Sequence, residues 1–192
     1  MRLKNKVVGS LIFVHVILSG CFSPNKRMSK EIEAMRKEII TLPLTLMQRY
    51  VGHKLTVQDG ENMPYKLVIY TDSVECSSCA LNSMYEWTDI LDSLQNHYPF
   101  AQAVFIFCPQ TDKRKQFKVK MLHRNFIYPI YLDTCNAFLR TNPHIPSNPL
   151  LHSFLLDEKD SVILVGNPVR NKKIEELFFK ILEERKDKQD KK

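Results

Sequence analysis

From Tyr65 onward, short apolar runs rich in Val, Ile, Leu and aromatic residues alternate with amphipathic segments, and this alternation constrains the fold more than any other feature. It predicts strands and helices in the order β, α, β, α, β, α, β, β, α. Strands that alternate with helices favour a parallel sheet covered on both faces, and a closing hairpin adds an antiparallel edge. The sequence therefore predicts an α/β domain with a mixed, mainly parallel sheet, ended by a β-hairpin and a helix.

The individual elements follow from the same patterns. The expected strands lie at 65–71, 103–107, 127–132, 153–157 and 161–166, with a further short strand at 54–57. The expected helices cover 26–40, a segment that begins at residue 79, 112–124, 133–140 and 171–185. In the helix from residue 79, one face gathers Ala80, Met84, Trp87, Leu91 and Leu94. We expect that face to pack into the core.

Cys76-Ser77-Ser78-Cys79 follows the first of these strands and opens the next helix. Two cysteines three positions apart at such a junction are typical of a dithiol that exchanges with a disulfide. Unpaired N–H groups at the helix start would stabilise a Cys76 thiolate and lower its pKa, whereas the charge of Glu75 opposes this. We expect Cys76 to be the exposed nucleophile, and Cys79 to be shielded and to resolve the mixed disulfide.

Two other interpretations of the CxxC stay open. The pair could form a static disulfide that locks the start of the helix, or half of a metal site. The metal site is disfavoured because no second CxxC or histidine pair stands at ligand spacing, so we predict no metal. His97, His123 and His144 are typical surface or hydrogen-bonded histidines, whereas His152 could face the cysteines.

The remaining cysteines beyond the signal region are Cys108 and Cys135. Each stands at the end of an expected strand or at the start of an expected helix. We interpret each as a small buried residue, and leave open a pairing between the two or a role as a resolving partner for the CxxC, because spacing in sequence does not give distance in the fold.

The N-terminus carries Arg2, Lys4 and Lys6, followed by a 12-residue apolar stretch at 7–18. That stretch is too short to span a bilayer, which takes about 20 apolar residues. It ends in Leu18-Ser19-Gly20-Cys21 and resembles a bacterial lipoprotein signal. The resemblance implies that Cys21 is lipidated and begins the mature chain; an ordinary signal peptide or an uncleaved anchor is the alternative interpretation.

Charge excludes one class of partner. The formal net charge is +7, and the three basic residues of the N-terminal signal reduce it to +4 once removed. The tail at 186–192 holds four Lys and two Asp, so it supplies +2 of that remainder. The folded part is nearly neutral and has no basic stripe with interleaved aromatic residues, so we expect no nucleic-acid partner.

The CxxC after the first core strand, the hairpin sequence Phe154-Leu155-Leu156-Asp157 and the final helix together resemble the thioredoxin superfamily. Its exported TlpA/ResA-like and AhpC/TSA-like members are most similar, over about 65–182. The resemblance implies a thioredoxin-like fold and thiol-disulfide exchange without a cofactor. Glu75 and Ser78 stand where active members commonly carry Trp and Pro. The family's cis-proline position falls near Leu151 or His152, which the resemblance makes substrate-positioning residues.

These observations divide the chain into a signal peptide (1–20), a lipidated N-terminus with a spacer helix and lead-in (21–60), a thioredoxin-like domain (61–185) and a charged tail (186–192). The predicted function is a thiol-disulfide oxidoreductase, lipid-anchored to a bacterial membrane in the periplasm or cell envelope. Its expected partners are envelope protein thiols and disulfides and a redox partner. The alternative is a redox-silent lipoprotein of the same fold that binds an envelope partner and keeps the disulfide for structure.

Overall fold

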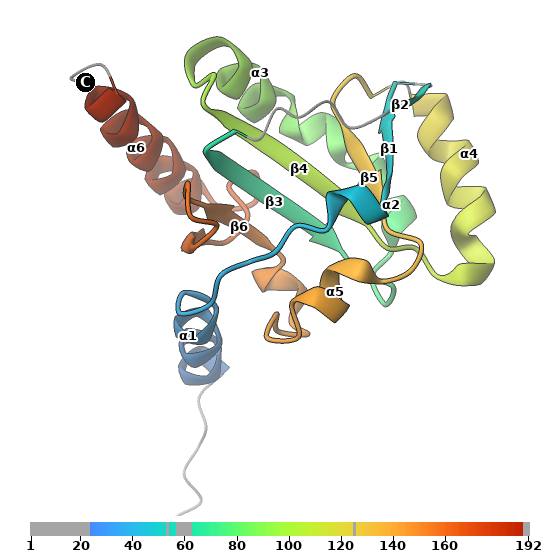
Figure 1. The fold of residues 1–192 in the computed structure, drawn as a ribbon, viewed down its shortest axis with the longest axis horizontal. Helices are drawn as coiled ribbons and strands as arrows, with labels where there is room; N and C mark the ends of the chain where they lie inside the picture. The colour runs from blue at the N-terminus through green and yellow to red at the C-terminus, as the bar shows by residue number, and fades with distance from the viewer. Residues whose placement is uncertain (1–23, 53, 57–62, 125, 190–192) are drawn as a thin grey trace, which may run out of the picture.

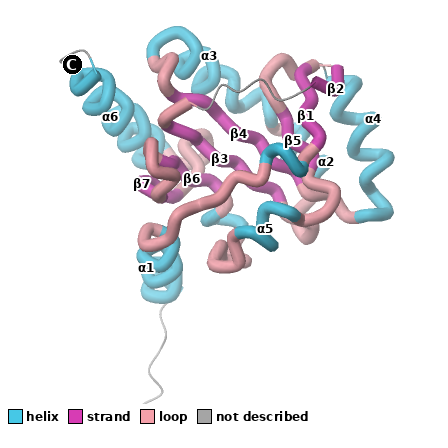
Figure 2. The backbone as a smooth tube through the Cα atoms, in the orientation of Figure 1, coloured by secondary structure: helices cyan, strands magenta, loops and turns pink. Residues whose placement is uncertain are grey.

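The computed structural model describes residues 24–52, 54–56, 63–124 and 126–189, and each structural statement below refers to these residues. A single seven-stranded sheet runs through the molecule with helices on both faces (Figures 1 and 2). In spatial order its strands are β2 (Lys54–Thr56), β1 (Gln48–Val51), β5 (Ile130–Leu132), β4 (Ala101–Phe107), β3 (Tyr65–Thr71), β6 (Ser153–Leu156) and β7 (Val162–Val165).

The centre of the sheet is parallel and both of its sides are antiparallel. Strand β4 pairs in parallel with β3 and with β5. The hairpin β6–β7 joins antiparallel to β3, and β1 and β2 add two antiparallel pairings beyond β5. The expected α/β fold, with helices on both faces, a closing β-hairpin and a final helix, is therefore confirmed, whereas the expectation of a mainly parallel sheet is wrong. The difference arises because β1, a short strand with one buried residue, was not predicted and pairs with β5.

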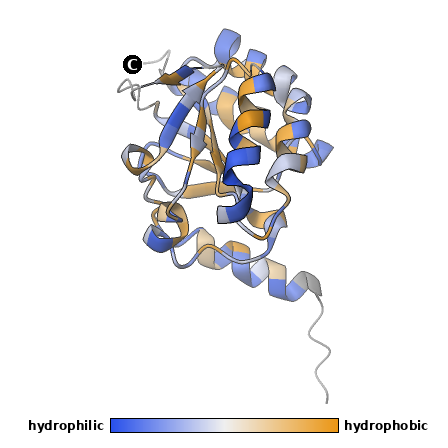
Figure 3. Cartoon of the chain, turned by 90° about the vertical axis from the view of Figure 1, so that its right-hand side faces the viewer, coloured by the Kyte–Doolittle hydropathy of each residue, from blue (hydrophilic) through white to orange (hydrophobic). Residues whose placement is uncertain are grey.

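Helices cover both faces of the sheet. They are α1 (Pro24–Met35), α2 (Ser77–Asn82), α3 (Thr88–His97), α4 (Arg114–Arg124), α5 (Ala137–Thr141) and α6 (Lys172–Gln189), with 3-10 turns η1 (Leu44–Leu46), η2 (Met84–Trp87), η3 (Thr111–Lys113) and η4 (Pro149–Leu151). Period-two alternation along β4 sends Phe105 and Phe107 into one core and Val104 and Ile106 into the other. Helices α2, α3, α4 and α6 cover the core that contains Phe105. Helices α1 and α5 cover the core that contains Ile106. Figure 3 shows apolar residues concentrated between these layers.

The helices expected at 26–40 and from residue 79 have different limits in the structure. The first helix ends at Met35 rather than at residue 40, because Ile40 is fully buried and its N–H donates to the Asp160 carbonyl at 2.9 Å. The helix expected from residue 79 is instead α2, η2 and α3 in succession, with a break at Ser83. Its predicted inner face is confirmed for the residues beyond the break: Met84, Trp87, Leu91 and Leu94 are buried, and Ala80 is half-buried.

The N-terminal part of the described chain belongs to the globule. Met35 is buried in the core of Ile106, and Met28 and Ile32 of α1 pack against that core. Strands β1 and β2, within the segment expected to be a lead-in, are part of the sheet. The expected signal at 1–20 and Cys21 lie outside the described residues. Within the described part, no helix is both long and apolar enough to cross a membrane.

Candidate functional site

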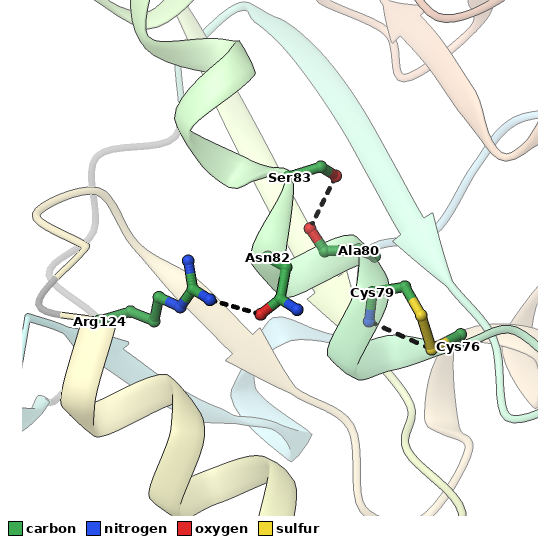
Figure 4. The surroundings of a disulfide bond; sticks show 6 residues. All are labelled: Cys76, Cys79, Ala80, Asn82, Ser83 and Arg124. Atoms are coloured by element: carbon green, nitrogen blue, oxygen red, sulfur yellow. Dashed lines mark hydrogen bonds between the residues drawn. A yellow bond between two sulfur atoms is a disulfide. The ribbon is translucent and has the colours of Figure 1, made fainter.

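A disulfide joins Cys76 and Cys79 at the point where β3 leads into α2 (Figure 4). Cys76 is the N-cap of α2, and its Sγ accepts a hydrogen bond from the Cys79 N–H at 3.2 Å. Helix α2 is held at its other end by Arg124 of α4, which donates to the Asn82 Oδ1 at 2.6 Å. The disulfide therefore lies at the start of α2, and a hydrogen bond joins the other end of α2 to α4.

Both cysteines are exposed to solvent, and the buried residue of the motif is Ser77. The expectation that Cys79 would be shielded is therefore wrong. The reason is that α2 is only six residues long and packs into the core through the residues after Cys79, the half-buried Ala80 and the buried Leu81. Sequence spacing places Cys79 one turn into the helix, but it does not show whether that turn is buried or exposed to solvent.

The loop before the disulfide is organised by two carboxylates. The buried Asp72 accepts hydrogen bonds from the backbone N–H groups of Val74 and Glu75 at 2.8 and 2.9 Å. This is a side-chain turn of the kind that aspartate forms with residues two and three positions ahead. The Glu75 Oε1 in turn accepts the Asp72 N–H at 3.2 Å and lies 2.9 Å from the Nδ1 of His152. The loop that delivers Cys76 is therefore fastened to the segment before β6.

His152 lies between two acceptors. Its Nε2 is 2.8 Å from the Pro146 carbonyl oxygen, which can only accept, so Nε2 carries a proton. Its Nδ1 faces the Glu75 carboxylate. Burial lowers the pKa of His152, but the hydrogen bonds to Glu75 and Pro146 and the charges of Glu75 and Asp72 outweigh burial and raise it. The arrangement favours an imidazolium that donates from both nitrogens, next to the residue that precedes Cys76.

The two residues predicted to position substrate, Leu151 and His152, are each only 2% exposed. Every described peptide bond is trans. Neither side chain reaches the surface beside the sulfurs, so a positioning role for them stays a prediction and would act through the loops that they hold. Sequence reasoning placed His152 near the cysteines but missed its partner Glu75, which is 77 positions away.

Asp72, Glu75 and His152 also bring three ligand atoms within 4.8 Å of one another, which is the spacing of a cation site. Hydrogen bonds already engage these residues: Nδ1 of His152 bonds to Glu75, and Oδ1 of Asp72 accepts two backbone N–H groups. A metal ion would have to displace the His152–Glu75 contact. The hydrogen bonds of the three residues therefore hold the loop that leads to the disulfide.

The other two described cysteines are free thiols and do not pair with each other. Cys108 is buried as expected, and its burial, followed by the charge of Asp133, raises its pKa to about 11. Cys135 is exposed, so the expectation of a buried residue is wrong for it. The cause is Asp133, whose buried carboxylate accepts the N–H groups of Ala137 and Phe138, both at 2.9 Å, and starts α5 later than predicted, at Ala137.

Comparison with known proteins gives no family model that matches the chain and no match among curated proteins. Solved structures that resemble it include the following three. A candidate thiol:disulfide interchange protein DsbE from Chlorobium tepidum has a TM-score of 0.48 and 16% identity, and the match covers 76% of this chain and 98% of the other. A hypothetical protein from Sinorhizobium meliloti 1021 has a TM-score of 0.45, 11% identity, and coverage of 68% and 70%. A conserved protein of unknown function from Bacteroides fragilis has a TM-score of 0.39, 18% identity, and coverage of 64% and 88%. At these identities a resemblance concerns the fold alone.

Proposed function

We propose that this chain is a thiol-disulfide oxidoreductase that exchanges disulfides with proteins of the cell envelope, with Cys76 as nucleophile and Cys79 as resolving cysteine. The observation that carries the proposal is an exposed Cys76–Cys79 disulfide whose Cys76 sulfur caps a helix. The Cys79 N–H that donates to this sulfur would stabilise a thiolate there in the reduced protein.

The exchange conserves atoms and electrons. In the reduced protein, the Cys76 thiolate attacks a substrate disulfide, a Cys76–substrate bond forms, and one substrate sulfur leaves as a thiolate. Cys79 then loses its proton and attacks the Cys76 sulfur. This step releases the second substrate thiolate and forms the Cys76–Cys79 disulfide. The substrate gains two electrons and the protein loses two; the reverse sequence oxidises a substrate dithiol.

The surface around the disulfide supports protein substrates. Val74, two positions before Cys76, is 78% exposed, and Leu150, two positions before His152, is 72% exposed. The 2.9 Å contact between Glu75 and His152 joins the loops that carry these two side chains. Exposed apolar side chains beside a reactive group are suited to hold an apolar stretch of another protein.

The reduction potential of the Cys76–Cys79 pair tests the proposal. The chain from Phe22 onward would be equilibrated in glutathione buffers, and its free thiols counted by mass spectrometry, with Cys135→Ser as background to remove the exposed free thiol. A reversible transition between about −120 and −270 mV, the span of known exchangers, would support catalysis and separate oxidant from reductant. A disulfide that resists reduction below about −300 mV would instead support the redox-silent binding module.

For location, we propose that lipid on Cys21 holds the protein on a bacterial membrane, facing the periplasm or cell envelope. The proposal rests on the signal-like sequence that ends at Cys21, and an oxidised CxxC is compatible with such a compartment. Two or more acyl chains on one cysteine would give stable attachment, whereas a single chain binds only marginally.

A further inference from the structure

Positive charge is concentrated at 113–124, which spans the end of η3 and all of α4 and is called the basic segment below. It holds six basic residues and no Asp or Glu: Lys113, Arg114, Lys115, Lys118, Lys120 and Arg124. The chain without its signal carries +4, of which the tail supplies +2, so 21–185 carries +2. Without the six charges of the basic segment, the rest of 21–185 carries −4. A nearly neutral domain therefore has one strongly basic helix.

The charges of the basic segment are not compensated. None of its six cations forms an ion pair with a carboxylate that the structure describes. Five of them are exposed and Arg114 is half-buried. Arg124 donates to the neutral side chain of Asn82, and Lys118 lies over the Tyr50 ring at 5.4 Å, so both keep their charge. The segment thus presents its positive charge to solvent.

The basic segment leaves the sheet at the same edge as the disulfide loop. Strands β3 and β4 are parallel and end level with each other, and the chain continues from β3 to the CxxC and from β4 to the basic segment. Acidic residues in these two connections do not cancel the charge. Asp72 is buried and Glu75 contacts His152, which leaves Asp112 as the exposed carboxylate of 72–82 and 108–124.

The contact between α2 and α4 brings these charges close to the sulfurs. The Arg124 Nη2 donates to the Oδ1 of Asn82, which follows Cys79 by three residues, less than one helical turn (Figure 4). Lys120 precedes Arg124 by four positions, so both lie on one face of α4. A protein interface covers about 800 Å² of each partner, a patch roughly 30 Å across. A partner that reaches Cys76 would therefore also cover this face of α4.

The free side of α4 suits another protein better than a lipid surface. Helices that lie on a membrane bury an apolar face in lipid. In α4 that face is already used, because Phe117 and Met121 are buried in the core that contains Phe105. Val119 is the one large apolar side chain of α4 that is exposed. What remains is charge, which steers and orients an oppositely charged protein.

We propose that the protein with which Cys76 and Cys79 exchange disulfides carries an acidic surface beside its reacting cysteine, and that this surface docks on the basic segment. This partner chemistry rests on the proposed function, because it concerns the same disulfide exchange. Opposite charges raise the rate of association and like charges lower it, and salt weakens both effects.

Two peptide disulfides of opposite charge test the partner's chemistry. Each peptide carries one cysteine as a pyridyl disulfide, and the two differ only in flanking residues, which are Asp in one and Lys in the other. The reduced protein, with Cys135→Ser to remove the exposed free thiol, attacks the peptide sulfur and releases pyridinethione, which is followed by absorbance. At about 0.1 M salt we expect the acidic peptide to react about tenfold faster than the basic one. At about 1 M salt, where the screening length is about 3 Å, the two rates should converge.

Lys113→Glu combined with Lys120→Glu should reverse this preference. The readout is the ratio of the two rates in one protein, because the ratio cancels any change in the reactivity of Cys76. The matched control combines Lys37→Glu with Lys159→Glu, two exposed lysines near the turn at 158–160, where the start of β3 lies. It changes the net charge equally and should leave the ratio unchanged.

Equal rates for the two peptides would overturn the acidic partner while leaving the exchange itself intact, whereas no reaction with either peptide would overturn both. Equal rates together with binding to phosphatidylglycerol vesicles would assign the basic segment to a membrane instead. A ratio that Lys113→Glu with Lys120→Glu does not change would overturn the role of α4. If circular dichroism shows that this variant does not fold, Lys120→Gln decides the same point, since it should lower the ratio about twofold or more.

Discussion

His152 shows at the residue scale how one buried side chain can join two loops beside the disulfide. Its ring donates to the Pro146 carbonyl and faces the Glu75 carboxylate, at 2.8 and 2.9 Å. A protonated ring satisfies both acceptors, whereas a neutral ring satisfies only one. The loop before Cys76 should therefore be held most firmly while His152 carries its proton.

This arrangement predicts a pH dependence of stability. The pKa of His152 is raised in the folded protein, so its contribution is complete below the ordinary histidine pKa of about 6.5 and is lost as pH rises through the folded-state value. Urea unfolding from pH 6 to 9 should show the free energy of unfolding falling over that interval. His152→Asn should flatten this fall and cost about 1–3 kcal/mol at pH 6. The control is His123→Asn at an exposed position, and an unchanged slope in His152→Asn would contradict the assignment.

The exposure of both sulfurs gives a second residue-scale prediction. Cys79→Ser should accumulate mixed disulfides with envelope proteins through Cys76, because the attacking thiolate remains and the resolving thiol is gone. Cys76→Ser should accumulate far fewer, because the N–H contact that favours a thiolate is to the Cys76 sulfur. Both variants need Cys135→Ser, since that thiol is also exposed. Non-reducing electrophoresis and mass spectrometry give the readout, and equal trapping by the two variants would refute the assigned roles.

At the scale of the element, local patterns predicted what depends on local chemistry. The apolar run 65–71, the hairpin with its turn at 158–160 and the final helix have their expected types because each repeats apolar residues at its own period. Strand β1 was missed because it is four residues long with a single buried residue, Tyr50. Its pairing with β5 depends on residues more than 75 positions away and leaves no local signal. The exposure of Cys79 also depends on how the rest of the fold packs around α2, so it could not be predicted from the residues near Cys79.

The late start of α5 leads to a prediction about this element. Asp133 is fully buried and accepts N–H groups from Ala137 and Phe138, so Asp133→Ala would leave buried donors without acceptors. We expect a loss of about 2 kcal/mol or more in the free energy of unfolding. The pKa of Cys108, raised by burial and by this charge, should fall, so that Cys108 is alkylated faster in the native protein. The exposed Asp112→Ala is the control, and unchanged stability would count against the cap.

At the scale of the whole molecule, the disulfide and a cavity walled by Lys66 and 101–103 lie at opposite ends of the same strands. The disulfide follows the carboxyl end of β3, and the cavity lies where β3 and β4 begin. The parallel register between β3 and β4 fixes this separation, because each residue from Tyr65 to Thr71 is paired with one from Ala101 to Phe107. Substitutions in the cavity wall can therefore be made without touching the residues around the disulfide.

The packing of α1 determines how an anchored molecule would sit. Met28, Ile32 and Met35 fix this helix to the globule, and Cys21 precedes its first residue, Pro24, by three positions. Three residues of extended chain span about 10 Å, so a lipid on Cys21 would hold the folded domain close to the membrane surface. Because Cys21 precedes the packed helix, its loss should not disturb the core.

Cys21→Ala should therefore move the protein from the membrane pellet to the supernatant after cell fractionation, with an unchanged thermal unfolding midpoint. Cys135→Ala is the matched control, because it removes another cysteine but leaves the signal sequence intact, and it should stay in the pellet. A Cys21→Ala protein that still sediments with membranes would refute lipid anchoring while leaving the redox proposal open to its own test. A lower unfolding midpoint would instead mean that the segment before α1 contributes to the fold.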